Sequence, residues 1–193
     1  MKEVLLDFPD SFDTERLTIR CPRPGDGAEF NRATVESWDR LQPWFVWAIE
    51  PPTVEENEIR LRQARAKFLT REDLWLLLFL KGTETLVGSS GLHSIDWSVP
   101  KFEIGYWVRT RYEGQGYITE AVKGIADFAF DTLGAKRVKI RCNTDNARSA
   151  AVARRAGFEY EGTTRCIRRH HLSKELVDEM IFSRIRRDEQ DKS

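Results

Sequence analysis

The segment RYEGQGYITEA, residues 111–121, constrains the fold most, because it places two glycines between a predicted strand and a predicted helix. The strand is expected over residues 102–109, which are rich in β-forming side chains. From residue 117 to residue 133, apolar residues recur at helical spacing, and Gly134 follows as a C-cap residue. A second β-rich run comes next, over residues 137–142. A strand, a crossover helix and another strand predict a parallel strand pair, and therefore a mixed α/β domain.

The residues on either side of this unit continue the α/β pattern. Residues 53–56 read Thr-Val-Glu-Glu, a capping box that begins a charged amphipathic helix. Alternation and turn residues predict the other elements: strands over 15–21, 74–80, 85–95, 158–166 and 176–185, and helices over 24–40, 53–70 and 146–156. The strands over 74–80, 85–95 and 102–109 are expected to form an antiparallel meander. No repeat or linker breaks the order, so we expect one domain over residues 1–193, with a core from about 14 to 186 and a loose tail at 187–193.

Charge and composition argue against some kinds of protein. Hydrophobic residues make up 40% of the 193, enough for a buried core, and the formal net charge of zero argues against a nucleic-acid-binding chain. Residues 136–169 hold ten Lys and Arg side chains and three acids, a net charge of +7, so the remainder carries −7. A local basic field of this size suits a small polyanionic ligand, although a solvated basic face gives the same pattern.

The cysteines and the apolar runs bear on the compartment. Cys21, Cys142 and Cys166 are too few and too scattered for a disulfide framework or a zinc site. The first residues lack the apolar core of a signal peptide, and the longest apolar run, residues 74–80, is too short to cross a bilayer. We therefore expect a cytoplasmic protein that binds no metal, no nucleic acid and no membrane.

The two glycines and the helix that follows them form a candidate anion site. A helix N-terminus offers unpaired N–H groups and the positive end of the helix dipole, and glycines let a ligand approach the backbone. The Gly-Lys-Ser/Thr of a P-loop is absent, and Thr119 stands where a dinucleotide fingerprint needs its third glycine. A third motif, the R/Q-x-x-G-x-G/A loop of acyl-CoA transferases, is matched in full by Arg111, Gly114 and Gly116.

The loop and its neighbours resemble a known family. FEIGYWVRTRYEGQGYITEAV (residues 102–122) and NTDNARSAAVARRAGFEYEG (residues 143–162) are similar to the central motifs of the GNAT superfamily of N-acetyltransferases. LQPWFVWA (residues 41–48) resembles the RimJ/RimL branch, which acetylates ribosomal protein N-termini. The resemblance covers residues 14–185. It implies a GNAT-type α/β fold, a central twisted and mostly antiparallel sheet with a splayed parallel strand pair, flanked by helices.

The resemblance also implies acetyl-CoA as a cosubstrate. The pantetheine arm would lie against main-chain groups at the end of a strand, and the diphosphate against N–H groups of the loop and the helix start. Asn143 and Asn146 would hold the pantetheine, unless they serve as a turn residue and a helix N-cap. The cofactor-binding residues that the resemblance implies are Tyr106, Trp107, Val108, Arg109, Arg111, Glu113, Gly114, Gln115, Gly116, Tyr117, Ile118, Thr119, Asn143 and Asn146.

The resemblance gives roles to two catalytic side chains. An amine is mostly ammonium at neutral pH, so it must lose a proton before it attacks a thioester. Glu161 stands where the branch has its general base. Glu159 would share a face with it on a regular strand, and Glu103 and His93 are further alternatives. Ser149 would protonate the leaving thiolate, or else be an ordinary residue of a helix start.

The expected reaction is direct transfer of the acetyl group from acetyl-CoA to a primary amine, with a main-chain N–H near Val108 stabilising the oxyanion. The resemblance favours the N-terminal α-amine of a ribosomal protein as acceptor, and Trp44 and Trp47 would wall the acceptor channel. HHLSKELVDEM (residues 170–180) lacks the glycine that the family often has at this hairpin turn, so this loop is expected to differ from that of the branch. The alternatives are an N-acetyltransferase for a polyamine, amino acid, aminoglycoside or peptide antibiotic, and a CoA-binding regulator. Relatives often pair, so a homodimer is expected.

Overall fold

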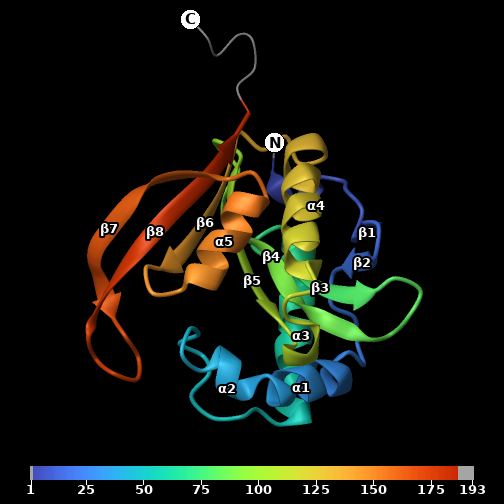
Figure 1. The fold of residues 1–193 in the computed structure, drawn as a ribbon. Coiled ribbons are helices and arrows are strands. Elements are labelled where there is room, and N and C mark those ends of the chain that lie inside the picture. Colours follow the sequence, from blue (N-terminus) through green and yellow to red (C-terminus); the bar gives the residue numbers. More distant parts are fainter. Residues whose placement is uncertain (1, 187–193) are drawn as a thin grey trace, which may run out of the picture.

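The chain folds around one large β-sheet, seen in a computed structural model that describes residues 2–186; the tail predicted at 187–193 lies outside this part (Figure 1). The strand order is β1-β2-β3-β4-β5-β6-β8-β7. The strands are β1 (Ser11–Asp13), β2 (Leu17–Arg20), β3 (Leu74–Leu80), β4 (Leu86–Asp96), β5 (Lys101–Val108), β6 (Arg137–Asn143), β7 (Glu159–Arg169) and β8 (Leu176–Ile185). Neighbours are antiparallel except β5 and β6, which are parallel. The predicted α/β fold with one parallel pair is confirmed.

Helices cover both faces of this sheet (Figure 1). One face carries α4 and α5, and the opposite face carries α1, α2 and α3. Their bounds, with two short 3₁₀ turns, are α1 (Gly27–Glu36), α2 (Trp38–Leu41), α3 (Val54–Thr70), α4 (Tyr117–Asp131), α5 (Ala147–Arg155), η1 (Glu3–Leu5) and η2 (Thr110–Tyr112). The capping box is confirmed, since Thr53 accepts a hydrogen bond from the Glu56 N–H and Glu56 accepts one from the Thr53 N–H.

Two features of the N-terminal half differ from the sequence prediction. The helix predicted over 24–40 is two helices, because the chain leaves helical geometry at Ser37, with φ −102° and ψ 6°. The buried Ser37 hydroxyl accepts a hydrogen bond from the Thr110 N–H at 3.0 Å, so a contact across the fold stabilises the break. The three-residue strand β1 was not predicted, because so short a strand leaves little alternation to detect.

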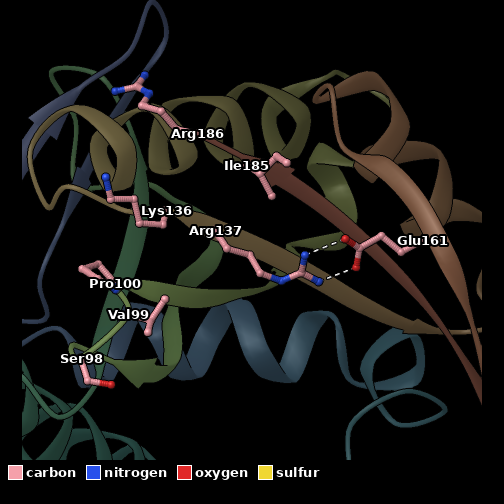
Figure 2. Close-up of a pocket in the computed structure, with 8 residues that line it drawn as sticks. All are labelled: Ser98, Val99, Pro100, Lys136, Arg137, Glu161, Ile185 and Arg186. Atoms are coloured by element: carbon pink, nitrogen blue, oxygen red, sulfur yellow. Dashed lines mark hydrogen bonds and ion pairs between the residues drawn. The ribbon is translucent and has the colours of Figure 1, made fainter. Parts of the chain in front are cut away.

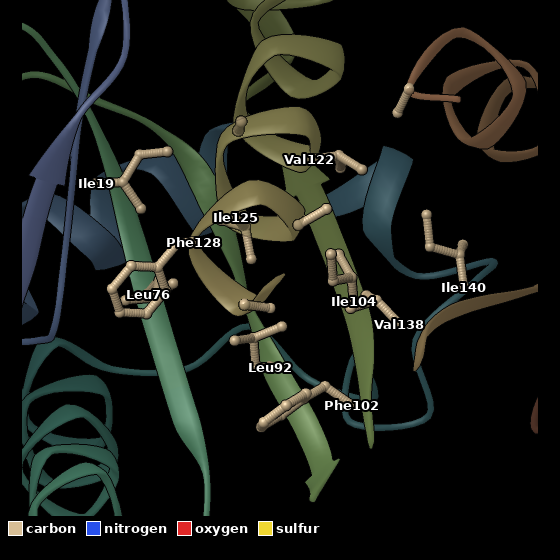
Figure 3. Packing of buried hydrophobic residues seen from close by; sticks show 14 of the residues in the cluster. Ile19, Leu76, Leu92, Phe102, Ile104, Val122, Ile125, Phe128, Val138 and Ile140 are labelled. Atoms are coloured by element: carbon tan, nitrogen blue, oxygen red, sulfur yellow. The ribbon is translucent and has the colours of Figure 1, made fainter. Parts of the chain in front are cut away.

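The larger hydrophobic core lies between α4 and the sheet (Figure 3). The predicted helical stripe Ile118, Val122, Ile125 and Ala129 is buried there. It packs over strand residues that point to the same face, including Leu92, Phe102, Ile104 and Val138. A smaller core under α1 and α3 buries the Trp107 side chain against Phe30, at 5.6 Å between ring centroids. The two cores hold β5 from both faces.

The parallel pair opens toward the C-terminal ends of its strands. The ladder joins residues 101–103 of β5 to residues 137–139 of β6. Beyond it, β5 continues to Val108 and β6 to Asn143 with no ladder between them in the part of the chain that the structure describes. The opening faces the start of α4 and the start of α5, which are the two segments that the sequence motifs single out.

Candidate active site

The edge of β5 beside this opening offers main-chain hydrogen-bonding groups. The Arg109 N–H donates to the Val87 carbonyl at 2.7 Å, so this residue turns its amide toward the β4 side. Peptide groups alternate in direction along a strand, and therefore Tyr106 and Val108 turn theirs toward β6, into the opening. Of the four strand residues predicted to meet the pantetheine, these two have main-chain groups that face the gap.

The side chains of Trp107 and Arg109 have structural roles. Trp107 is buried in the smaller core. Arg109 is 5% exposed and donates to Glu29 at 2.9 Å and to Glu36 at 2.8 Å, both on α1. These contacts fix the end of β5, so that the main-chain groups beside the opening keep a fixed position.

Tyr106 and Ser149 meet at the opening. The Tyr106 hydroxyl lies 2.9 Å from the Ser149 hydroxyl and 3.0 Å from the Ser149 carbonyl oxygen. Burial raises the pKa of Tyr106, so its phenol stays protonated at neutral pH. Cys142, at the end of β6, is also beside Ser149, and burial raises the pKa of its thiol. The opening is therefore lined by neutral groups that can donate a proton or a hydrogen bond.

The two asparagines have local bonds at the same place. The Asn146 side-chain oxygen accepts from the Ser149 N–H at 3.0 Å, and this makes Asn146 the N-cap of α5. The Asn143 side-chain oxygen accepts from the Asp145 N–H at 2.9 Å, within a turn. The structure thus shows the N-cap and turn roles that were the alternatives to cofactor contact.

The glycine loop adopts the backbone that the anion site requires. Gly114 and Gly116 have φ values of +73° and +84°, a left-handed region that favours glycine. Gly116 is the N-cap of α4. Because glycine has no side chain to accept a hydrogen bond, it leaves the N–H groups that begin the helix uncapped. The predicted residues Tyr117, Ile118 and Thr119 supply these groups.

A cavity of about 410 Å³ lies beside this helix start. Its lining residues are Glu15, Arg16, Gly116, Thr119, Glu120, Lys123 and Arg155. Three of them are basic, and Arg155 belongs to the basic stretch 136–169 noted in the sequence. Arg16 and Lys123 were missed, because they lie outside that stretch. Arg16 is paired with Glu120 at 2.6 Å, so Lys123, Arg155 and the N–H groups that begin α4 are the groups that the cavity offers to a phosphate.

The other polar side chains of the loop already have bonding partners. Arg111 forms an ion pair with Glu36 on α1. Glu113 pairs with Arg148 at 2.7 Å, and the Gln115 side chain donates to the Arg111 carbonyl oxygen at 2.9 Å. These contacts hold the loop to α1 and α5. The Arg111 side chain is therefore engaged, whereas the sequence suggested that it contacts an anion directly.

Glu161 forms an ion pair at the start of β6 (Figure 2). Its carboxylate is paired with Arg137, the first residue of β6, and accepts from the Ser183 hydroxyl at 2.7 Å. The Arg137 guanidinium and then Ser183 lower the pKa of Glu161 to about 2. Ser149, by contrast, lies in the first turn of α5, which comes after the C-terminal end of β6, whereas Arg137 is at the N-terminal end of that strand.

A cavity of about 550 Å³ adjoins this ion pair, at the paired end of β5 and β6. Its lining residues are Ser98, Val99, Pro100, Lys136, Arg137, Glu161, Ile185 and Arg186 (Figure 2). The register of β7 against β8 shifts between Tyr160 and Gly162. Such a bulge adds a residue to one strand, so the alternation that put Glu159 and Glu161 on one face does not hold across it.

Trp44 and Trp47 lie in the segment after α2 and are partly exposed. Trp47 packs against Trp38, with 6.4 Å between ring centroids. The turn between β7 and β8 reaches the same segment: His170 Nε2 lies 2.8 Å from the Pro43 carbonyl oxygen, and His171 Nε2 lies 2.8 Å from that of Gln42. The structure therefore joins the tryptophan segment to the hairpin that the sequence singled out as unusual.

Residues 2–186 hold neither a metal-binding group nor a helix that could span a membrane. No group of three or more His, Cys, Asp or Glu side chains there could hold a metal ion. None of the helices in this part of the chain is both long and apolar enough to cross a membrane.

Comparison with known proteins gives the family. The model of the acetyltransferase (GNAT) domain matches residues 16–159. The Bacillus subtilis protein named "Putative ribosomal N-acetyltransferase YdaF" is 32% identical over 152 residues, which cover 78% of this chain and 82% of that one. The ribosomal-protein-serine acetyltransferase of Escherichia coli is 26% identical over 147 residues, which cover 75% and 79%. The crystal structure of the microcin C7 self-immunity acetyltransferase MccE, in complex with acetyl-CoA and AMP, has a TM-score of 0.83 at 22% identity, and covers 95% of this chain and 100% of that one.

The fold and the opened parallel pair define an acyltransferase of the GNAT type. The chain belongs to the GNAT acetyltransferase family. The relatives named as ribosomal acetyltransferases support the RimJ/RimL-like branch within it.

Proposed function

We propose that this protein transfers the acetyl group of acetyl-CoA directly to a primary amine, and that the amine is the N-terminal α-amine of a protein, ribosomal proteins first. The observation that carries the reaction is the Tyr106–Ser149 pair at the opening of β5 and β6, beside the main-chain groups of Val108. The acceptor rests on the names of the relatives, one of which is a ribosomal-protein-serine acetyltransferase.

In this proposal acetyl-CoA lies along the opening. The pantetheine arm pairs with the main-chain groups of Tyr106 and Val108, and the diphosphate sits on the N–H groups that begin α4. Lys123 and Arg155 line the cavity there and supply charge for the adenosine 3′-phosphate. The MccE neighbour, which is in complex with acetyl-CoA, supports a coenzyme site in this fold.

The proposed chemistry needs three groups around the thioester. A main-chain N–H near Val108 stabilises the oxyanion that forms when the amine attacks. Ser149, held by Tyr106, donates a proton to the leaving thiolate. A base removes the ammonium proton, and Glu161 is the residue that the resemblance implies. That role would require Glu161 to leave Arg137 and Ser183 first, because its carboxylate bonds to both.

The test is the release of CoA thiol from acetyl-CoA against a panel of acceptors. The panel holds Ser-, Ala- and Met-starting peptides from ribosomal proteins, polyamines, free amino acids and aminoglycosides. The proposal expects release with one or more of the peptides and little with the small amines. Release with a small amine alone would keep the reaction and overturn the acceptor. Binding of acetyl-CoA with no release from any acceptor would favour a regulator.

The proposal also includes a cytoplasmic location and a homodimer. Cell fractionation tests the first and light scattering of the purified protein tests the second. Recovery in the membrane fraction would contradict the first, and a monomeric mass at assay concentration would contradict the second.

A further inference from the structure

His93 and Asp73 form a hydrogen-bonded pair on the face of the sheet opposite α4. Asp73 immediately precedes β3, and His93 lies near the end of β4, where Leu74 pairs with Leu92. His93 Nδ1 lies 2.7 Å from the Asp73 carboxylate. A carboxylate accepts, so Nδ1 carries the proton and Nε2 is left as the acceptor of a neutral ring. A carboxylate that orients a histidine in this way is the arrangement of a general base and its positioning residue.

The ring of His93 lies over two glycines. A Cβ atom placed on Gly91 would be 2.9 Å from Nε2, and one placed on Gly105 would be 3.5 Å from Cδ2. A side chain at either position would therefore press on the ring or limit the approach to it. The His93 side chain is 33% exposed, so an acceptor can reach it.

The position of Gly105 relates His93 to the reaction centre. Gly105 and Tyr106 are consecutive in β5, and successive side chains point to opposite faces of a sheet. Tyr106 reaches Ser149 on the α5 side, whereas Gly105 lies under His93 on the other side. If the thioester lies in the opening beside β5, Tyr106 and Ser149 can donate a proton to its sulfur from one face of the sheet. His93 lies on the opposite face of the sheet, from which the amine would attack.

The charged groups around His93 favour this role over that of Glu103. Glu103 lies opposite His93 in the register of β4 and β5. Its carboxylate forms ion pairs with two residues of β6, Lys139 at 3.2 Å and Arg141 at 3.0 Å. Arg141 also reaches Glu179 of β8, at 3.2 Å. Glu103 thus belongs to an ion-pair network. Asp73 has His93 as its bonded partner through Nδ1, and this bond leaves Nε2 as the acceptor atom of the ring.

We infer that His93, oriented by Asp73, accepts the proton of the attacking amine in acetyl transfer. This inference rests on the proposed function. An N–H bond of the ammonium breaks and a bond from that proton to Nε2 forms, directly or through one water. The electron pair left on nitrogen attacks the thioester carbonyl carbon, and the C–S bond electrons leave with sulfur. Nitrogen loses a second proton as the amide forms, and this loss balances the proton that Ser149 donates to the thiolate. The imidazolium then returns its proton to solvent.

The kinetic test is the pH dependence of kcat/KM with the best acceptor peptide of the thiol-release panel. For the unaltered protein we expect kcat/KM to fall at acidic pH, because a ring that carries protons on both nitrogens cannot accept one from the amine. In His93→Gln, kcat/KM at neutral pH should fall by roughly 10²- to 10⁴-fold, the usual contribution of a general base. The deficit should shrink as pH rises past about 8, where an α-amine loses its own proton. A structural defect would not be relieved in this way.

Three variants separate the pair from general damage. Asp73→Asn should lower kcat/KM as well, because an amide no longer fixes the proton on Nδ1. His171→Gln removes an imidazole from the hairpin and should keep the acidic limb of the profile. CoA binding by calorimetry reports that each variant is folded. A His93→Gln protein with the same acidic limb and the same deficit at every pH would overturn the inference.

A second measurement needs no acceptor. Nitrogen-15 NMR of the histidine rings at neutral pH should show His93 protonated at Nδ1 and not at Nε2. A His93 ring protonated at Nε2 alone would overturn the inference whatever the kinetics show. If the unaltered protein releases no thiol with any acceptor, the proposed function fails, and the NMR result still decides the state of His93.

Discussion

Replacement of Gly114 by alanine separates the fold from the coenzyme site. Gly114 has φ +73°, and a Cβ atom placed on it would meet no other atom within 4 Å. The cost to the fold is therefore at most the strain of a left-handed backbone, about 1–2 kcal/mol, and the loop relieves this strain when it leaves the left-handed region. For a chain of this length each kcal/mol lowers Tm by roughly 2–4 °C.

The expected effect on coenzyme binding is larger. A backbone that leaves the left-handed region at Gly114 turns the following N–H groups away from the phosphates. A hydrogen bond to a charged group contributes about 1.5–3 kcal/mol. Loss of two such bonds costs roughly 3–6 kcal/mol, which weakens CoA binding by about 10²- to 10⁴-fold.

Gly134 provides the matched control, at the other end of α4. It has φ +67°, and a Cβ atom there would also meet nothing within 4 Å. Calorimetry of CoA binding and thermal unfolding should show similar losses of stability in Gly114→Ala and Gly134→Ala, but weak binding in the first variant alone. Equal CoA affinities in the two variants would refute the placement of the diphosphate on this loop.

Three further predictions concern single side chains. Ser149→Ala should lower kcat by roughly tenfold, which is less than the full contribution of a general acid, because a thiolate is a tolerable leaving group. KM for acetyl-CoA should change less than kcat, and equal changes in the two constants would indicate a binding role for Ser149. Arg155→Ala should remove most of the difference in affinity between CoA and 3′-dephospho-CoA, and a persisting difference would place the 3′-phosphate elsewhere. Glu161→Gln should destabilise the fold at pH 7 by up to about 1 kcal/mol, a small value because the pair with Arg137 is partly exposed. The folded pKa of Glu161 is lowered, to about 2, so this contribution is full above the unfolded value of about 4.3 and is lost as pH falls toward 2. Chemical unfolding at pH 7 and pH 3 measures it, and an equal difference at both values would contradict the ion-pair origin.

Local signals explain what the sequence could predict about the fold. The capping box at Thr53 and Glu56 satisfies its own N–H groups, so it can be recognised without the rest of the chain. The buried stripe of α4 could be predicted because its apolar residues recur at helical spacing. The parallel pair of β5 and β6 could be predicted because the segment between them is long enough for a crossover helix. The break at Ser37 depends on Thr110, 73 residues away, and no local pattern contains that bond.

The candidate site, too, has residues whose positions local sequence signals predict and residues whose positions depend on contacts elsewhere in the fold. The glycine loop was predictable, because left-handed backbone at Gly114 and Gly116 leaves a residue-type signature. The position of Glu161 was not, because a bulge and an ion pair with Arg137 redirect its carboxylate. The Asp73–His93 pair had a usable signal: the two predicted strands, 74–80 and 85–95, form a hairpin whose register places these residues across from each other.

The most direct test of acetyl transfer to an α-amine uses one peptide that contains both kinds of amine. The peptide begins with serine and has one internal lysine, and it is incubated with acetyl-CoA and the protein. Tandem mass spectrometry then locates any acetyl group. We predict one acetyl group on the N-terminal serine and none on the lysine. Acetylation of the lysine alone, or an unmodified peptide from a protein that acetylates a small amine, would contradict the proposal.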